Sequence, residues 1–117
     1  MTEYVLLFRL DLTTPGAQPS QAELDGYMGG WMRWIEGIAA QGQLADGGNH
    51  FSVEGRVIRR NGVERTLYQA NAESVAGYIV VSADSFDSAV EMAKACPILD
   101  GRAASVEVRA TASPGTA

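Results

Sequence analysis

The chain has 117 residues, a formal net charge of −5 and a hydrophobic fraction of 46%, which are values typical of one soluble domain with an apolar core. Its acidic balance argues against direct binding of nucleic acid, because proteins that contact the phosphate backbone present a basic face. No apolar run approaches the ~18 residues of a membrane-spanning helix, no basic N-terminal signal is visible, and Cys96 is the only cysteine. We therefore expect a cytoplasmic protein without disulfides or membrane contact.

The N-terminal segment favours a strand. Residues Tyr4–Leu10 are apolar and β-prone with Arg9 as the only charge, a composition typical of a central strand covered on at least one face. A loop rich in proline and glycine follows at residues 15–19. We expect residues 1–110 to form a single domain and residues 111–117, which are small and include proline, to form a flexible tail.

A long helix is indicated after this loop. Ser20 lies three residues before Glu23, the spacing of a capping box, and Gly42 suits a left-handed cap at the other end. Apolar side chains recur between them at intervals of three and four, so one stripe of the helix is expected to face the sheet. The stripe consists of Tyr27, Met28, Trp31, Trp34, Ile35 and Ile38.

Four glycines lie inside this helix, and each costs up to about 1 kcal/mol relative to alanine. Two explanations remain open. Close packing of another segment is the one we favour, because small residues beside large aromatic ones let a helix fit tightly onto a twisted sheet; contact with a ligand is the other. The four are Gly26, Gly29, Gly30 and Gly37.

The middle of the chain is typical of a β-hairpin. Asn61-Gly62 separates two β-prone segments, Arg56–Arg60 and Val63–Tyr68, and this dipeptide favours a type I′ turn. Two glutamates interrupt the arginines of this region, so we interpret the basic cluster as a solvated surface. The cluster consists of Arg56, Arg59, Arg60 and Arg65, and the glutamates are Glu54 and Glu64.

The last part of the chain predicts a strand, a helix and a further strand. Tyr78–Val81 is an unbroken apolar run, Ser85 or Asp84 can cap a helix, and Pro97 ends it. The final strand alternates Val106 and Val108 with polar residues, which predicts one buried side. The apolar positions of the helix are Phe86, Ala89, Val90, Ala93 and Cys96.

The expected element order is strand, helix, three strands, helix and strand. Two helices in this order cover only one face of a single antiparallel sheet, as in a ferredoxin-like α+β sandwich. The other face would leave apolar side chains in water in a monomer. We therefore expect a homodimer that forms through the open sheet face.

Four segments carry a resemblance to a known family: Trp31–Trp34 running into Ala40–Gly42, the strand start Gly77-Tyr78, Ala93–Leu99 and Ser105–Arg109. In these segments, and over nearly the whole chain, the sequence resembles the YCII-related superfamily and within it the DGPF group of small bacterial proteins. The resemblance implies a ferredoxin-like sheet that pairs with a second copy as a dimeric α+β barrel. It also implies a cleft in each protomer between helix, sheet and neighbouring loops.

The chain departs from this family at its chemical positions. The DGPF group is named after an Asp-Gly-Pro-Phe turn, and the equivalent segment is Arg65–Tyr68, which keeps only the aromatic residue. Dehydrochlorinating enzymes of the superfamily carry a histidine on the first helix and an aspartate before the proline that follows the second. Trp31 and Cys96 stand at those places, so an acid–base pair of this kind does not carry over.

Other chemistry has little support. His50 is the only histidine and follows Asp46 in a segment that we expect to be a loop, where an imidazole beside a carboxylate can shuttle protons. A lone loop histidine is more often a surface residue, since catalysis needs a second oriented group. Gly47-Gly48 lacks the strand and lysine of a phosphate loop, and no spacing of metal ligands is present. We expect no cofactor and no metal.

The aromatic residues suggest a different role. A cleft lined by rings binds small apolar or aromatic molecules, although a helical stripe of this kind also covers a sheet whatever the function. Trp31 is the stronger candidate of the two tryptophans, because it occupies the place of the superfamily's histidine. The candidate binding residues are Tyr27, Trp31, Asp46, His50 and Tyr68.

Two functions follow from these observations. The first is a non-catalytic module that binds a small ligand or serves as an accessory protein; the DGPF resemblance implies an association with transcription initiation. The second is an enzyme that acts on a small aromatic or lactone-like molecule between the helices. A carboxylate within hydrogen-bond reach of His50 would favour the enzyme, and aromatic walls without a titratable group would favour the binding module.

Overall fold

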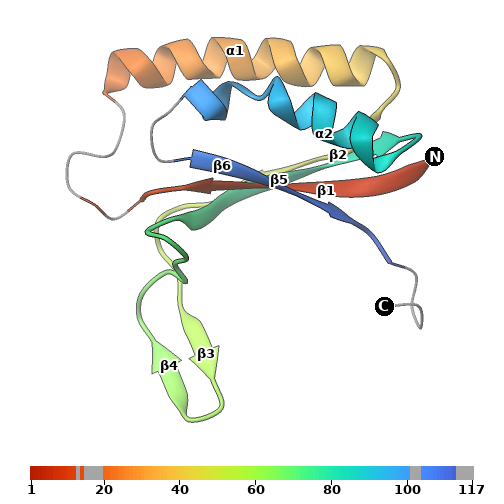
Figure 1. Cartoon of the computed structure of the whole chain (residues 1–117). Coiled ribbons are helices and arrows are strands. Elements are labelled where there is room, and N and C mark those ends of the chain that lie inside the picture. The colour runs from red at the N-terminus through yellow and green to blue at the C-terminus, as the bar shows by residue number, and fades with distance from the viewer. Residues whose placement is uncertain (13, 15–19, 101–103, 113–117) are drawn as a thin grey trace.

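The computed structural model describes residues 1–12, 14, 20–100 and 104–112, so the expected loop at 15–19 and most of the expected tail lie outside it. Two helices cover one face of a four-stranded antiparallel sheet, whose strand order is β2-β5-β1-β6 (Figure 1). This is the expected α+β, ferredoxin-like arrangement. The strands are β1 (Thr2–Leu10), β2 (Leu44–His50), β5 (Ser74–Ala83) and β6 (Ala104–Ala110), and the helices are α1 (Gln21–Ala40) and α2 (Phe86–Lys94).

The core lies between the sheet and the helices. Alternate residues of the two central strands are buried there, because successive side chains of a strand point to opposite faces. The helix layer adds Ile38 of α1, Ala89 and Ala93 of α2, and Cys96 just after α2, which are 7%, 0%, 5% and 2% exposed. The strand residues are Tyr4, Leu6 and Phe8 of β1 and Ile79, Val81 and Ala83 of β5.

Both helices begin where the sequence indicates, and α1 also ends there, whereas α2 ends at Lys94, so that Cys96, expected within it, lies beyond its end. The Ser20 hydroxyl accepts a hydrogen bond from the Glu23 amide at 3.2 Å, and the Glu23 carboxylate accepts one from the Ser20 amide at 3.3 Å. Gly42 follows α1 with a φ of +70°. Ser85 caps α2, and Pro97 opens the short 3-10 turn η1 (Pro97–Asp100). No helix of the described residues is long and apolar enough to cross a membrane.

The glycines of α1 have different surroundings. A Cβ on Gly30 would lie 3.3 Å from the Pro97 ring, so this glycine permits close packing of α1 on η1. Gly26 and Gly37 face open space, so neither packing nor a described contact accounts for them. Close packing thus explains Gly30 among the four glycines of α1.

Two local predictions were wrong. The segment from Asp46 to His50 was expected to be a loop, but it belongs to β2, an edge strand that pairs antiparallel with β5 through two irregularities. The hairpin of β3 (Val57–Arg59) and β4 (Gly62–Glu64) forms, but Arg60 and Asn61 are its turn residues. Asn61 does not have a positive φ, so the turn is not of type I′, which requires that conformation at both turn residues.

The second face of the sheet carries no helix among the described residues. Half-buried apolar side chains of the central strands lie on it beside an ion pair of 2.9 Å between Arg9 and Glu107. The β3–β4 hairpin projects from the same side (Figure 1). Beyond β6, the amide and hydroxyl of Thr111 both donate to the Glu3 carbonyl, which extends the pairing with β1. The half-buried apolar residues on this second face, which we call the open sheet face, are Val5, Leu7, Tyr78 and Val80.

Candidate functional site

Four rings from three distant segments form what we call the aromatic cluster: Phe8 of β1, Trp31 and Trp34 of α1, and His50 of β2. Trp31 is at its centre. Its ring centroid lies 4.7 Å from that of Phe8, 5.2 Å from that of Trp34 and 5.1 Å from that of His50. The Phe8 and Trp34 rings meet Trp31 at 75° and 62°, the edge-to-face geometry that aromatic quadrupoles prefer, whereas the His50 ring is tilted by 56° to Trp31.

Strand register positions the cluster. Phe8 of β1 and His50 of β2 are both paired with Gly77 of β5. Trp31, which contacts both of their rings, therefore spans the glycine position between them. Since strands lie about 4.8 Å apart, a single indole can reach from one neighbour to the other.

Two glycines bring β2 close enough to β5. A Cβ on Gly77 would lie 2.6 Å from the Asn49 carbonyl oxygen, and a Cβ on Gly48 would overlap the carbonyl of Tyr78. Gly48 also has a φ of +63°, which side-chain-bearing residues rarely adopt. These glycines hold the end of the edge strand, and with it His50, against the sheet.

The two ends of the cluster differ in exposure. The indole nitrogen of Trp34 donates to the Met92 carbonyl of α2 at 3.0 Å, so this ring is a structural link between the helices. His50 is exposed and Trp31 is half-buried. The Trp31–His50 end is therefore the part of the cluster that reaches solvent, and we call this end the aromatic shelf.

The other candidate residues have separate surroundings. Tyr27 lies one helical turn before Trp31 and is half-buried, so it extends the same side of α1. The Asp46 carboxylate accepts a hydrogen bond from the Gly48 amide at 2.7 Å, within its own strand. Tyr68 is 62% exposed and lies beneath the guanidinium of Arg59 in β3, and the β3–β4 hairpin projects from the side of the sheet opposite α1 (Figure 1). The structure thus joins Trp31 to His50 and leaves Tyr68 apart.

The surroundings of His50 and Cys96 limit the reactions in which these two side chains could take part. Among the described residues, no hydrogen bond joins His50 to a carboxylate, and no three metal-ligating side chains gather. Burial raises the pKa of the Cys96 thiol to about 11, so this sulfur is protonated at neutral pH and is a poor nucleophile.

Sequence reasoning assigned Phe8 to the core strand but missed its place beside Trp31. The unbroken apolar run of Tyr4–Leu10 indicated a strand covered on at least one face, but not which of its residues face the helices. Its partner depends on the pairing of strands far apart in the chain, for which the sequence gives no direct signal. The strand that carries His50 was missed for the same reason.

The fold and the cluster define the class as an α+β protein with a ferredoxin-like sheet and an aromatic shelf beside its first helix. No family model and no curated protein matches the chain. One solved structure that matches is 5-chloro-2-hydroxyhydroquinone dehydrochlorinase from Burkholderia phenoliruptrix, in complex with 2,5-dihydroxybenzoquinone. It is 18% identical, the match covers 89% of this chain and 90% of that chain, and the TM-score is 0.47. The resemblance to the DGPF group stays a prediction.

Proposed function

We propose that this protein is a non-catalytic module that binds a small aromatic or apolar ligand on the aromatic shelf. The observation that carries the proposal is the packing of the exposed His50 ring on the half-buried Trp31 ring, with centroids 5.1 Å apart. Two rings that are held by a helix and a strand offer a pre-formed surface, which reduces the entropy cost of binding. Planar ligands add offset or edge-to-face contacts to such a surface.

The chemistry of the shelf supports binding over catalysis. Proton transfer requires a base and an orienting partner within hydrogen-bond distance, and the hydrogen bond of Asp46 goes to the Gly48 amide. Trp31 and Cys96 also replace the acid–base residues of the enzymes that the sequence resembles. A binding role needs none of these groups. An accessory role in transcription initiation, which the DGPF resemblance implies, is compatible with a ligand-responsive module.

We also propose that the protein is a homodimer through the open sheet face. The apolar side chains there are half-buried and sit beside the Arg9–Glu107 ion pair. An apolar centre with a charged rim is typical of protein interfaces. Burial of the centre would stabilise association by about 25 cal/mol per Å² before the entropy cost is subtracted.

Binding is tested with a panel of phenols, aromatic acids and lactones, by calorimetry and by turnover assays. Trp31→Ala should weaken binding of any ligand found by about tenfold, because it removes the larger ring of the shelf. His50→Phe should keep the affinity within about twofold, because it keeps a ring and removes the titratable nitrogens. Met32→Ala, which is 51% exposed on the same helix, is the control and should bind like the wild type.

The enzyme alternative makes the opposite prediction for His50. Turnover of a panel member by the wild type that disappears in His50→Phe, with the fold intact by circular dichroism, would replace the binding module with an enzyme. Equal affinity of the wild type and Trp31→Ala would show that ligands bind away from the shelf.

A further inference from the structure

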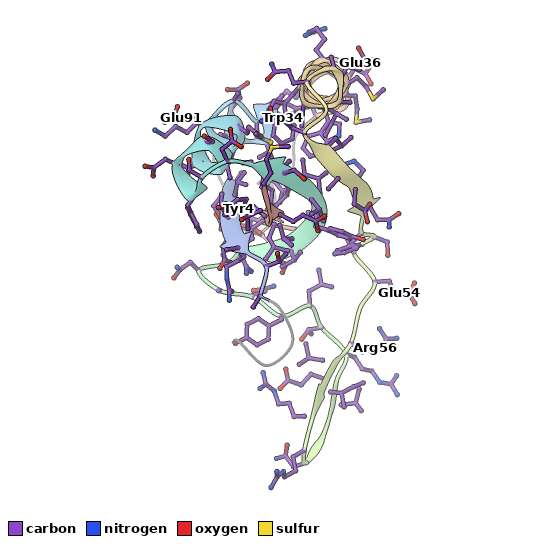
Figure 2. The ribbon with its side chains drawn as sticks, turned by 90° about the vertical axis from the view of Figure 1, so that its right-hand side faces the viewer. Tyr4, Trp34, Glu36, Glu54, Arg56 and Glu91 are labelled. Carbon is purple, nitrogen blue, oxygen red and sulfur yellow. The ribbon has the colours of Figure 1, made fainter. Side chains whose placement is uncertain are left out.

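The β3–β4 hairpin and its flanks, residues 52–69, form what we call the arm. In Figures 1 and 2 the arm projects away from the sheet on the side opposite the helices. Its apolar residues are in water: Ile58 is 80% exposed, Val63 is 61% exposed and Tyr68 is 62% exposed. Ile58 and Val63 are direct cross-strand partners, so their side chains share one face and form a single apolar spot.

The arm has little to stabilise it within one chain. A two-stranded hairpin is at best marginally stable in water unless further strands or a helix pack on it. Each of its strands has only three residues. The Arg59–Glu64 ion pair and the Arg59–Tyr68 contact both lie within the arm. An apolar spot at the end of such a projection is typical of a contact surface.

Charge is divided unevenly between the arm and the rest of the molecule. The arm holds four of the nine basic side chains and two of the fourteen acidic ones, a net charge of +2, which leaves −7 on the rest of the chain. Within the arm, Glu64 is paired with Arg59. Arg60 and Arg65 are exposed next to the apolar spot. The arm is therefore complementary in charge to the remainder of its own chain.

We propose that the arm grips a second copy of this chain. The inference rests on the proposed homodimer and adds a second contact to it, separate from the sheet-to-sheet one. Because the arm projects on the side of the open sheet face, a two-fold axis that brings two open faces together also brings each arm alongside the other copy's body. In this arrangement each arm, with a net charge of +2, lies against the body of the other copy, whose net charge is −7. The contact also covers Ile58 and Val63.

The same charge distribution argues against nucleic acid as the occupant. A phosphate backbone that approached the arm would also approach the acidic body, and salt-dependent binding of nucleic acid needs several unopposed basic side chains. A second copy instead offers the arm a body whose net charge is −7. The arm of the second copy makes the same contact with the first copy, so the assembly is complete as a dimer.

Sedimentation equilibrium from about 1 to about 100 μM tests the arm with two sets of variants. Ile58→Ser with Val63→Ser removes the apolar spot without a change in charge. Arg60→Glu with Arg65→Glu reverses the charge beside it. Each pair should raise the dimer dissociation constant about tenfold, and the effect of the charge reversal should shrink in high salt. Circular dichroism and denaturation confirm that the core still folds.

The matched control variants are at exposed positions of α1, on the side of the sheet opposite the arm (Figure 1). Met28→Ser with Met32→Ser alters two methionines that are 52% and 51% exposed on α1, and Arg33→Glu reverses an exposed charge there. Both should leave the dissociation constant within about twofold of the wild type. Leu7→Lys places a charge on the open sheet face and tests the sheet contact independently of the arm.

The outcomes separate the two proposals. Loss of the dimer on Leu7→Lys with no effect of either arm pair would overturn the arm proposal and retain the sheet-to-sheet dimer. A wild type that is monomeric at the highest concentration would overturn both. A monomer that binds mixed-sequence duplex DNA, and loses that binding on Arg60→Glu with Arg65→Glu, would assign the arm to nucleic acid instead.

Discussion

Position 34 needs an indole because both the ring and the nitrogen of Trp34 make contacts. Its ring contacts Phe8 and Trp31 with centroids 5.9 Å and 5.2 Å away, and its nitrogen donates to the Met92 carbonyl. A phenylalanine would fill much of the volume but would leave that carbonyl without this donor, which costs about 1 kcal/mol in typical cases. One side chain therefore packs α1 on the sheet and ties it to α2.

Trp34→Ala and Ile38→Ala should each lower the free energy of unfolding by about 2–5 kcal/mol, because each removes a large side chain from a packed interior. Urea denaturation measures the loss. Glu36→Ala is the control, because Glu36 lies on the outer side of α1 (Figure 2), and its effect should stay within about 0.5 kcal/mol. Near-zero losses for both core variants would show that the orientation of α1 is wrong.

Cys96 gives a pH-dependent prediction. Burial raises its pKa from 9.0 to about 11, so the folded state holds the thiol proton more tightly than the unfolded state does. The resulting stabilisation is complete below pH 9 and is lost as the pH rises from about 9 to about 11. The difference in unfolding free energy between the wild type and Cys96→Ala should therefore shrink across this range. A difference that stays constant with pH would contradict the burial of the thiol.

At the scale of elements, the glycines of α1 allow a paired test. Gly37→Ala should raise the free energy of unfolding by about 0.5–1 kcal/mol, because alanine favours the helix and the position faces open space. Gly30→Ala should gain less or nothing, because its Cβ would lie 3.3 Å from the Pro97 ring, which would have to move. Thermal denaturation of the two variants measures both. Equal gains would show that α1 and η1 are not closely packed.

The elements also show what the sequence could predict. The capping box at Ser20 and the apolar stripe of α1 are local signals, and the helix follows them except at Met28, which was expected to face the sheet but is 52% exposed. The strand β2 has no such signal, because Asp46, the two glycines after it and Asn49 all disfavour strands. It forms because Gly48 and Gly77 let its backbone approach β5, and this approach is a tertiary property.

The candidate site was predictable in part for the same reason. Trp31 stood out on the helix by its spacing, and His50 by being the only histidine. Their contact depends on β2, which was expected to be a loop, so the sequence suggested both residues without the pairing. Tyr68 was grouped with them by residue type alone, but its ring lies beneath the guanidinium of Arg59 in β3, and the β3–β4 hairpin projects away from α1 (Figure 1).

At the scale of the whole molecule, the arm is an insertion into an otherwise simple sheet. The strands β2 and β5, which flank it in the chain, are neighbours in the sheet, so the fold closes without help from the residues between them. We therefore expect the arm to open while the core stays folded, so that the protection of the arm depends on what it contacts.

This independence gives a last prediction, which hydrogen exchange can measure. Amides of β1 and β5 should exchange most slowly, because these strands are paired on both sides and carry the core. Amides of the arm should exchange orders of magnitude faster in dilute protein, since their opening leaves the core intact. If the arm grips a second copy, its exchange should slow as the protein concentration rises through the dimer dissociation constant, while peptides from α1 stay unchanged. Arm amides that are already as protected as those of β5 in dilute protein would show that the arm folds with the core, whereas fast exchange at every concentration would leave the arm without a partner.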